Sequence, residues 1–349
     1  MSGSVAEAIM SEHQPALVSR GARPLDAQTA AFIGQMQAAG FRPAHQIPLE
    51  ESRQGLTQMA RQMAGPKAEV HSIEDRNIPG PGGDLPLRFY RPQATAPGLR
   101  LPAVVFYHGG GFYLGGFDTH DHLCRNLCRG AGVVVVAVDY RLAPEHKFPA
   151  AVEDGYAALA WVAREAGALG IDPARIALAG DSAGATLVVT TCLLARERGG
   201  PPIALQVGVY PALAVTDGDE YPSRRRLGTG EYFIAIEDFA FFRRLYLTDP
   251  EREARLPLVS PIYAADYRGL PPAIMVAAGY DPCVDEDRHY VERLRADGVA
   301  ASWICYAGTI HPFFLFDGVF DSGRAAQQLV AGAVREFFET GKLPPDQEH

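Results

Sequence analysis

The chain has 349 residues and a mass of 37.7 kDa, and its 47% hydrophobic and 21% charged residues exclude wholesale disorder. Its 32 Lys and Arg against 41 Asp and Glu give a net charge of −9, which argues against a nucleic-acid-binding protein. The longest apolar stretch, residues 131–138, is far shorter than the roughly 20 residues of a membrane-spanning helix.

Two features of the sequence bear on where the protein works. The N-terminal residues contain no cationic segment followed by an apolar one, so no signal peptide is predicted. Five cysteines, an odd number in a chain of this length, do not form the pattern of a disulfide framework. We therefore expect a cytoplasmic protein with free thiols.

The N-terminal part of the chain is predicted to be helical. Residues 1–65 carry apolar residues in helical spacing interrupted by prolines, and we expect two or three short helices there that belong to a cap. Two strands then follow, one around residues 70–78 and one over 85–90, joined by the Pro- and Gly-rich turn at 79–83. This change of pattern places a boundary at about residue 66, between the helical N-terminal part and a domain built on a sheet.

Strands and helices alternate through most of the remaining chain. Strands are expected over 103–107, 133–138, 176–179, 203–210, 273–278 and 301–306, and helices over 150–166, 183–198, 285–296 and 325–340. Such alternation predicts an α/β fold with a mostly parallel central sheet and helices on both faces. Residues 212–262 interrupt it and are interpreted as a cap insertion, which leaves 66–211 and 263–349 for the catalytic domain.

Residues 180–184, Gly-Asp-Ser-Ala-Gly, form the only Gly-x-Ser-x-Gly motif in the chain. A predicted strand precedes the motif and a predicted helix follows it, which is the setting of a nucleophilic serine held on a sharp turn. Ser182 is therefore the candidate nucleophile, and it needs a base to accept its proton. The alternative interpretation is a serine that only caps the following helix.

Residues 108–112, His-Gly-Gly-Gly-Phe, follow the predicted strand at 103–107. Successive glycines leave backbone N–H groups accessible, and such donors stabilise the oxyanion of acyl transfer. We assign the donors to Gly109 and Gly110, with Ala183 as the third. The alternative is a phosphate-binding loop, but the spacing matches neither a Walker A loop nor a dinucleotide fingerprint.

With residues 139–146, Asp-Tyr-Arg-Leu-Ala-Pro-Glu-His, these two motifs resemble the hormone-sensitive-lipase-like (bacterial family IV) esterases of the α/β-hydrolase superfamily. The resemblance extends over about residues 70–340 and implies an α/β-hydrolase fold with a helical cap, carboxylesterase activity and no cofactor. Two positions differ from the family pattern: Ala185 replaces a glycine, and Pro312 replaces a small residue. A proline at 312 favours extended backbone at residue 311.

The base is sought among the histidines that follow Ser182, because α/β-hydrolases carry their triad in the order Ser, acid, His. His289 falls inside a predicted helix, and the terminal His349 is expected to be frayed. His311 lies in a loop after the predicted strand 301–306, at the same edge of the sheet as Ser182. We therefore predict that His311 is the general base.

The acid is predicted to be Asp281, which follows the strand at 273–278 closely. It would fix the tautomer of His311 and stabilise the protonated ring. Asp285 is the less favoured alternative, since it is better placed to cap the next helix. The family pattern, a strand followed by Asp-Pro-x-x-Asp-Glu, also favours Asp281.

Several other polar and aromatic residues receive a predicted role. The charged residues of the family run are interpreted as ion-pairing groups behind the site: Arg141, Glu145, Glu153 and Asp154. The run His120-Asp121-His122 lacks a third ligand at a telling spacing, so no metal is expected. The substrate pocket is expected to be lined by residues that flank the motifs: Phe112, Tyr113, Asp181, Tyr210 and Phe313.

These features predict a hydrolase that cleaves short- to medium-chain acyl esters through an acyl-enzyme on Ser182. A lactone or amide hydrolase with the same triad is an alternative, because one triad serves every acyl transfer. A non-catalytic binding protein is a second alternative, although the retained His311 speaks against it. The expected partner is a small-molecule ester, with no nucleic acid and no membrane span, and a homodimer is left open.

Overall fold

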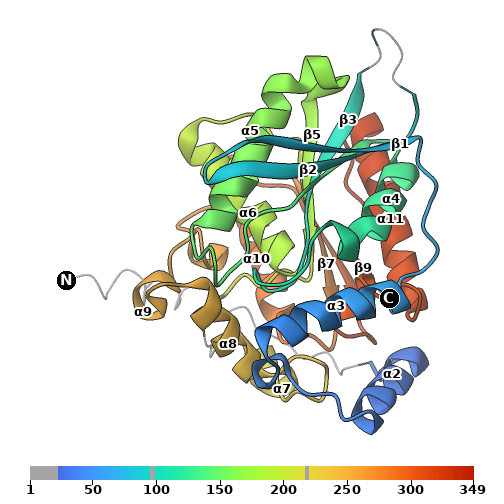
Figure 1. Ribbon diagram of the computed structural model, residues 1–349, viewed down its shortest axis with the longest axis vertical. Helices are drawn as coiled ribbons and strands as arrows, with labels where there is room; N and C mark the ends of the chain where they lie inside the picture. Colours follow the sequence, from blue (N-terminus) through green and yellow to red (C-terminus); the bar gives the residue numbers. More distant parts are fainter. Residues whose placement is uncertain (1–22, 95–97, 99, 217–219) are drawn as a thin grey trace.

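The structure is a computed structural model that describes residues 23–94, 98, 100–216 and 220–349. A nine-stranded sheet runs through the centre of this described part of the chain (Figure 1). The strand order is β1-β2-β4-β3-β5-β6-β7-β8-β9. β2 pairs antiparallel with β1 and β4, and every other pair is parallel, which confirms the mostly parallel sheet. The strands are β1 Ser72–Gly80, β2 Gly83–Arg91, β3 Leu101–Tyr107, β4 Val134–Val138, β5 Ile171–Asp181, β6 Leu205–Val209, β7 Ala273–Ala278, β8 Ala301–Tyr306 and β9 Gln347–Glu348.

Helices cover both faces of this sheet (Figure 1). On one face the apolar core joins the strands to α5 (Ala150–Leu169), α6 (Ala183–Arg198) and α10 (Val284–Ala296). On the other face it joins them to α4 (Phe117–Ala131) and α11 (Asp321–Thr340). Between these layers β4 is buried along its whole length, as its apolar run predicts.

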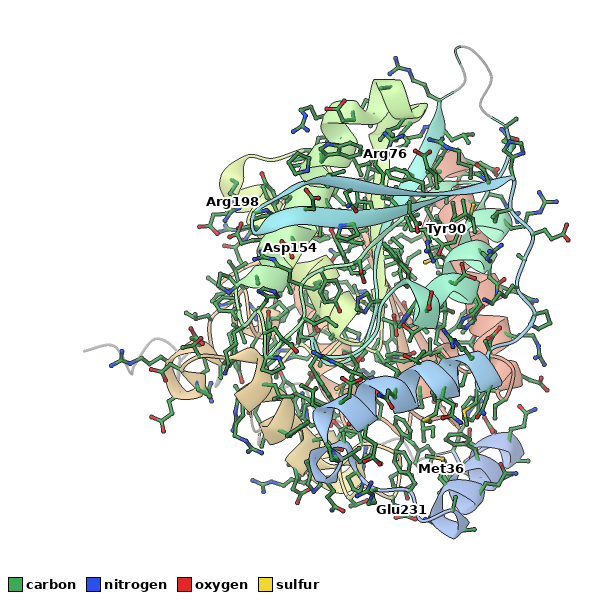
Figure 2. The ribbon with its side chains drawn as sticks, viewed as in Figure 1. Met36, Arg76, Tyr90, Asp154, Arg198 and Glu231 are labelled. Atoms are coloured by element: carbon green, nitrogen blue, oxygen red, sulfur yellow. The ribbon has the colours of Figure 1, made fainter. Side chains whose placement is uncertain are left out.

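Polar side chains also join the sheet and its loops to the helices that cover it. Tyr90 of β2, marked in Figure 2, donates its hydroxyl to Asp121 of α4 at 3.2 Å. Asp154 on α5 binds the side chain of Arg141 with two hydrogen bonds of 2.8 Å. Tyr90 therefore joins β2 to α4, and Asp154 joins α5 to the loop that follows β4.

Short helices gather at the carboxyl end of the parallel strands, where Figure 1 shows α3, α7 and α8. The N-terminal part supplies α2 (Ala27–Ala38), η1 (Ala44–Gln46) and α3 (Leu49–Met63). The segment between β6 and β7 supplies α7 (Pro222–Leu227), α8 (Ile236–Tyr246), α9 (Pro250–Glu253) and η2 (Pro261–Tyr263). Asp238 of α8 accepts hydrogen bonds from the backbone N and ring Nδ1 of His45 in η1, both at 2.9 Å. The two segments therefore contact each other, and the division into cap and catalytic domain stays a prediction.

The C-terminal residues form a strand where fraying was expected. The backbone N of His349 donates to the carbonyl of Cys305 at 2.8 Å, and the N of Ala307 donates to the carbonyl of His349 at 3.0 Å. The ring of His349 also stacks on Tyr306, with centroids 4.7 Å apart. The prediction of a frayed terminal histidine was therefore wrong, because β9 continues the sheet beyond β8.

Two predictions drawn from composition can be compared with the coordinates. All five cysteines are free and buried, as their odd number suggested. Within the described ranges, no helix combines the length and the apolar character that crossing a membrane requires. The residues on which the signal-peptide prediction rests lie outside the described part of the chain.

Candidate active site

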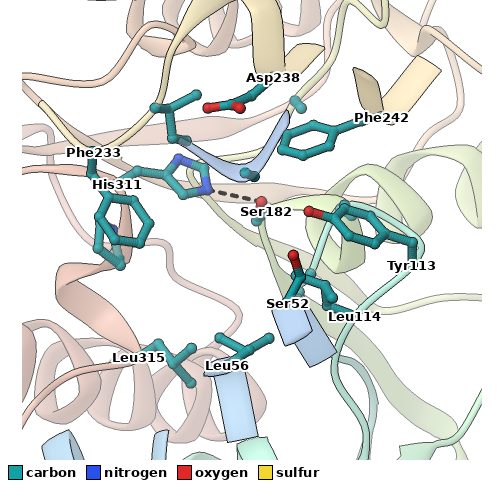
Figure 3. Close-up of a pocket in the computed structure, with 18 of the residues that line it drawn as sticks. Ser52, Leu56, Tyr113, Leu114, Ser182, Phe233, Asp238, Phe242, His311 and Leu315 are labelled. Atoms are coloured by element: carbon teal, nitrogen blue, oxygen red, sulfur yellow. Dashed lines mark hydrogen bonds between the residues drawn. The ribbon is translucent and has the colours of Figure 1, made fainter. Parts of the chain in front are cut away.

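Ser182, His311 and Asp281 meet at the carboxyl ends of β5, β8 and β7. Figure 3 shows the contact between Ser182 and His311. Nε2 of His311 lies 2.8 Å from Oγ of Ser182, and Nδ1 of the same ring lies 2.5 Å from Oδ2 of Asp281. Asp281 is fully buried, and its other oxygen accepts a hydrogen bond from the backbone N of Cys283 at 2.9 Å. This buried carboxylate fixes which ring nitrogen carries the proton, so Nε2 is left to accept one from the serine.

The turn that carries Ser182 is strained and tightly packed. Ser182 has φ 51° and ψ −123°, a region that side chains other than glycine rarely adopt. A Cβ on Gly184 would lie 2.0 Å from the carbonyl oxygen of Tyr107, and one on Gly180 would lie 2.6 Å from the same atom. Glycines at 180 and 184 therefore let β5 and α6 approach β3 closely enough to form the turn.

The alternative role of Ser182 as a helix cap finds no support. Ser182 occupies the position before α6, but its side chain makes no capping hydrogen bond. Its hydroxyl instead contacts His311, while its backbone N donates to the carbonyl of Val209 at 2.8 Å. The backbone thus anchors the turn, and the side chain is left for chemistry.

Replacing Gly184 with alanine is expected to destabilise the fold by at least about 3 kcal/mol, because the new Cβ would meet backbone atoms of β3, which cannot rotate away. Urea denaturation followed by circular dichroism measures this change. Gly332→Ala is the matched control, since no atom lies within 4 Å of its Cβ position on α11, and it should be neutral or slightly stabilising. Equal stability of the two variants would contradict the packing argument.

A side chain of the neighbouring helix α4 contacts the loop that carries His311. Nε2 of His122 lies 3.0 Å from the carbonyl of Leu315, and the ring of Tyr210 lies 4.3 Å from the His311 ring. His311 begins η3 (His311–Phe314), and the extended residue is Ile310, with φ −114° and ψ 167°. The predicted extended backbone at 311 was therefore wrong, because Pro312 fits the first turn of a helix, where its missing N–H costs nothing.

Asp285 contacts the segment between β6 and β7 and does not contact Ser182 or His311. One of its carboxylate oxygens accepts a hydrogen bond from the backbone N of Ser223 at 2.8 Å. The helix α10 begins at Val284, so Asp285 lies in its first turn and does not cap it as predicted. His289, further along α10, lies 2.9 Å from the hydroxyl of Tyr221, away from the triad.

The glycine loop lies beside Ser182 but differs from the prediction at its first glycine. The N–H of Gly109 donates to Oδ1 of Asp181 at 2.9 Å, so it is not free for an oxyanion, and this assignment was wrong. Gly110 and Gly111 have φ of 122° and 60°, which glycine adopts without strain. Among the described residues, neither of their N–H groups has a protein acceptor.

Asp181 lines the cavity, as the sequence predicts, and its carboxylate also holds the glycine loop. Its side chain is 3% exposed and lies within 3.1 Å of Nε2 of His120. Burial opposes ionisation, but the charge of the His120 ring and the hydrogen bonds from His120 and Gly109 hold the pKa of Asp181 below its ordinary value. An ionised carboxylate therefore fixes the first glycine of the loop from below.

A cavity of about 330 Å³ opens above Ser182 and His311 (Figure 3). Its walls come from α3, the glycine loop, α8 and the loop after β8, and most of the side chains are apolar. Phe112, Tyr113 and Tyr210 line it, whereas Phe313 does not. Phe313 is fully buried and its ring packs 5.2 Å from Tyr306, so its predicted place in the pocket was wrong.

The chain is similar to known proteins over most of its length. Residues 104–315 match a family model described as the alpha/beta hydrolase fold. The chain belongs to the α/β-hydrolases, in the hormone-sensitive-lipase-like group. It is 42% identical to the carboxylic ester hydrolase LipN of Mycobacterium tuberculosis over 76% of this chain and 69% of LipN.

Two further comparisons cover still more of the α/β-hydrolase chain. The esterase LipI of Mycobacterium tuberculosis is 36% identical over 86% of this chain and 92% of its own. A hyperthermophilic esterase from the archaeon Pyrobaculum calidifontis superposes with a TM-score of 0.84 and 41% identity, over 90% of this chain and 99% of its own. With these relatives the chain is an enzyme of the carboxylesterase class.

The charged residues of the run 139–154 form ion pairs in this α/β-hydrolase, as predicted. Arg141 pairs with Asp154 at 2.8 Å, and Glu145 accepts two hydrogen bonds of 2.8 Å from Arg53 of α3. Glu153 pairs with a residue at the end of α6, Arg198. None of these groups lies within hydrogen-bonding distance of Ser182, His311 or Asp281. The ion pairs instead join the segments of backbone around those residues.

The two positions where this α/β-hydrolase departs from the family pattern are accommodated by their neighbours. Ala185 is fully buried on α6, and a Cβ on Gly208 of β6 would lie 3.6 Å from its methyl group. That separation is an ordinary van der Waals contact, so the methyl group of Ala185 fits beside β6 without crowding. Pro312 fits the turn at η3 as described above.

The run His120-Asp121-His122 diverges because each side chain faces a different element of the α/β-hydrolase fold. His120 contacts Asp181 and His122 contacts Leu315, whereas Asp121 accepts a hydrogen bond from Lys67 at 2.9 Å. In the described ranges, no group of three His, Cys, Asp or Glu side chains could hold a metal ion.

The sequence analysis assigned no chemistry to α3, yet this helix forms one wall of the α/β-hydrolase cavity. Ser52, Gly55, Leu56 and Met59 line the cavity at a spacing of three or four residues, one helical face. This spacing was the available signal, but it is shared by every amphipathic helix and does not distinguish a pocket wall from a core contact.

Proposed function

We propose that this carboxylesterase cleaves short- to medium-chain acyl esters through an acyl-enzyme on Ser182. The continuous hydrogen-bonded chain from Asp281 through His311 to Ser182, opening into the cavity, is the observation that carries the proposal. A cavity of about 330 Å³ falls at the lower end of the usual range for ligand pockets, which suits small substrates.

In the proposed mechanism, Nε2 of His311 takes the proton of Ser182 as its oxygen attacks the ester carbonyl. Asp281 stabilises the resulting imidazolium without accepting its proton. When the tetrahedral intermediate collapses, His311 gives that proton to the departing alkoxide. Water, activated by the same ring, then attacks the acyl carbonyl and releases the acid together with Ser182.

The oxyanion is proposed to bind three backbone N–H groups, those of Gly110, Gly111 and Ala183. Gly110 and Gly111 line the cavity and have no protein acceptor among the described residues. Ala183 begins α6, where the first N–H groups lack an intrahelical partner. One such donor is worth about 3–4 kcal/mol of transition-state stabilisation.

The proposed division of labour assigns the described part of residues 1–65, together with 212–262, to a cap over the site. This assignment is supported by the contact between His45 and Asp238 and by the cavity residues that both segments supply. The cap would set the acyl length, whereas the sheet carries the triad. Relatives named for small substrates, such as an ethyl acetate hydrolase of Pseudomonas putida at 34% identity, support the size range.

Trapping the covalent intermediate tests the proposal directly. An alkyl phosphonate with a p-nitrophenol leaving group should attach one group per chain, and peptide mass spectrometry should find it on Ser182. Labelling should stop in His311→Ala, because the hydroxyl would lose its base. Labelling elsewhere, or equal labelling of the two proteins, would contradict the mechanism.

A panel of matched butyric acid derivatives separates the alternative functions. Turnover of an alkyl butyrate faster than of a lactone or an amide of the same size supports the ester assignment. Faster lactone or amide cleavage would favour the alternative bond, since the same triad serves all three. Stoichiometric binding of every member without turnover would favour a binding protein.

A further inference from the structure

Within the described part of the chain, four residues that line the cavity carry a buried hydroxyl without a hydrogen bond: Ser52, Tyr113, Tyr210 and Tyr246. Ser52 and Tyr113 lie on facing parts of the wall, α3 and the glycine loop. Ser52 on α3 is 9% exposed and Tyr113 in the glycine loop is 1% exposed, and both belong to the cavity wall. Among the residues that the structure describes, neither hydroxyl has a protein partner. Buried hydroxyls are normally paired, because an unpaired one costs about 1–3 kcal/mol.

Ser52 differs from the neighbouring hydroxyl on the same helix. Thr57 donates its hydroxyl to the carbonyl of Arg53, four residues back, at 2.9 Å, which is the usual partner of a hydroxyl inside a helix. Ser52 makes no such bond, and its side chain points into the cavity, as Figure 3 shows. The hydroxyl of Ser52 is therefore presented to whatever occupies the cavity.

Tyr113 is held rigidly by its surroundings. Its ring packs 5.8 Å from Phe241 and 5.4 Å from Phe242, both on α8, and a Cβ on Gly111 would lie 2.9 Å from the ring. Figure 3 shows its hydroxyl directed towards Ser182. A ring fixed in this way presents its O–H in one direction, so a bound acceptor pays little additional ordering entropy.

The side chain of Arg53 links the two segments that carry these hydroxyls. Arg53, the residue after Ser52, donates its Nε to the carbonyl of Tyr113 at 3.0 Å and its Nη2 to the carbonyl of Ala143 at 3.0 Å. The same guanidinium binds the carboxylate of Glu145. α3 and the glycine loop are therefore fixed relative to each other beside the triad.

The carboxylates that line the same cavity already have partners. Glu51 pairs with Arg42, and Asp181 accepts a hydrogen bond from the N–H of Gly109. Asp238 lines the cavity, but it is 2% exposed and accepts hydrogen bonds from His45 and from the backbone N of Ala235 at 2.9 Å. It serves to join α8 to η1. The unpaired hydroxyls of Ser52 and Tyr113 are thus among the polar groups that this apolar wall offers, together with those of Tyr210 and Tyr246. Of these, Tyr113 directs its hydroxyl towards Ser182 and Ser52 directs its own into the cavity (Figure 3).

We propose that Ser52 and Tyr113 bind an oxygen atom of the substrate other than those of the scissile ester. The substrate class is an ester with a second acceptor oxygen, such as an ether, hydroxyl or carbonyl oxygen, a few atoms from the reacting carbonyl. This inference rests on the proposed ester hydrolysis and adds the feature that distinguishes one ester from another. A site built to hydrogen-bond a substrate oxygen discriminates strongly against analogues that lack it.

Isosteric pairs of esters test this proposal. p-Nitrophenyl methoxyacetate and p-nitrophenyl butyrate differ by one oxygen on the acyl side, and 2-methoxyethyl acetate and butyl acetate differ by one on the alcohol side. We compare kcat/KM within each pair for the wild type, Tyr113→Phe and Ser52→Ala, so that intrinsic reactivity cancels between proteins. Tyr156→Phe, a half-buried tyrosine on α5 that does not line the cavity, is the matched control.

The variants should lower kcat/KM about tenfold for the oxygen-bearing member of one pair, and by twofold or less for its alkyl match. The pair that responds shows whether the oxygen lies on the acyl or the alcohol side. Equal losses on both members of each pair, or no loss on any, would overturn the proposal.

A separate outcome concerns the proposed function itself. If the wild type cleaves none of the four esters and takes no phosphonate on Ser182, ester hydrolysis fails and the inference fails with it. If every variant keeps phosphonate labelling of Ser182 but shows no pair-specific loss, ester hydrolysis stands and only the substrate inference fails. The two results are therefore distinguishable.

Discussion

Replacement of Ser182 by alanine should lower kcat for p-nitrophenyl butyrate by about 10⁶-fold. The hydroxyl is the attacking atom in the proposed mechanism, and no other described hydroxyl lies at hydrogen-bonding distance from Nε2 of His311. Initial rates at saturating ester measure the loss. A residual rate of about 10³–10⁴ over water is expected, since the oxyanion donors and the cavity are retained.

The control for this variant is Ser72→Ala, which removes a half-buried hydroxyl at the start of β1, far along the sheet from the cavity. It should retain wild-type rates. Ser182→Ala should also keep the wild-type unfolding midpoint or raise it, because the strained serine contributes little to stability. Turnover by Ser182→Ala within tenfold of the wild type would remove Ser182 as the nucleophile.

Replacement of Arg224 by methionine should destabilise the protein by about 3–5 kcal/mol. Arg224 on α7 and Glu286 on α10 are both fully buried, and they are joined by three hydrogen bonds of 2.8–3.0 Å. The guanidinium also lies 3.6 Å from the centre of the Phe239 ring. Without Arg224, the carboxyl of Glu286 would be left in the interior with no cation, which is the costly half of a broken buried pair.

Denaturation in urea, followed by fluorescence, measures the loss. Arg198→Met is the matched control, because Arg198 forms a comparable pair with Glu153 at the surface, where both side chains are at least 30% exposed. Figure 2 labels Arg198 at the end of α6. This control should cost less than about 1 kcal/mol. Equal losses for the two variants would show that burial does not determine the cost of this pair.

Activity should fall with Arg224→Met as well. Glu286 accepts hydrogen bonds from the backbone of Leu213 and Ala214, and it lies on the helix that starts just after Asp281. The buried pair therefore connects the segment between β6 and β7 to the strand end that carries the acid of the triad. If α7 loosened, the first turn of α10 could shift, and Asp281, which lies just before that turn, would shift with it.

The triad could be predicted from sequence because its members follow strands of a regular alternation. Ser182, Asp281 and His311 each come after a parallel strand, and the carboxyl ends of parallel strands meet at one edge. The boundaries of β7, β8 and α6 agree with prediction to the residue, since runs of mostly apolar residues mark the strands and a Gly-Gly stop marks the end of the helix.

The oxyanion loop could not be predicted residue by residue. Three successive glycines look alike in sequence, but one N–H, that of Gly109, points at the Asp181 carboxylate and the next two do not. Which way an amide points depends on φ at Gly110 and Gly111, and sequence spacing does not contain that angle.

The pocket was the least predictable part. Phe313 follows His311 closely but turns into the core, because η3 has three residues per turn and residues two apart on it point in different directions. Ser52 and its helix come from a segment more than a hundred residues before Ser182, and a serine on an amphipathic helix carries no distinguishing pattern. Contacts made across such distances become visible only once the chain has folded.

The pairing of β9 with β8 has a consequence for how copies of this protein meet. An unpaired edge strand at the margin of a sheet can form hydrogen bonds with a strand of another molecule. Here that margin is occupied by the chain's own tail, which Asp346 fastens through Arg295 at 2.5 Å and through the backbone N of Trp303 at 3.0 Å. Two molecules could pair their β8 strands only after β9 had separated from β8 in both of them. The hydrogen bonds of β9 therefore oppose self-association along this edge.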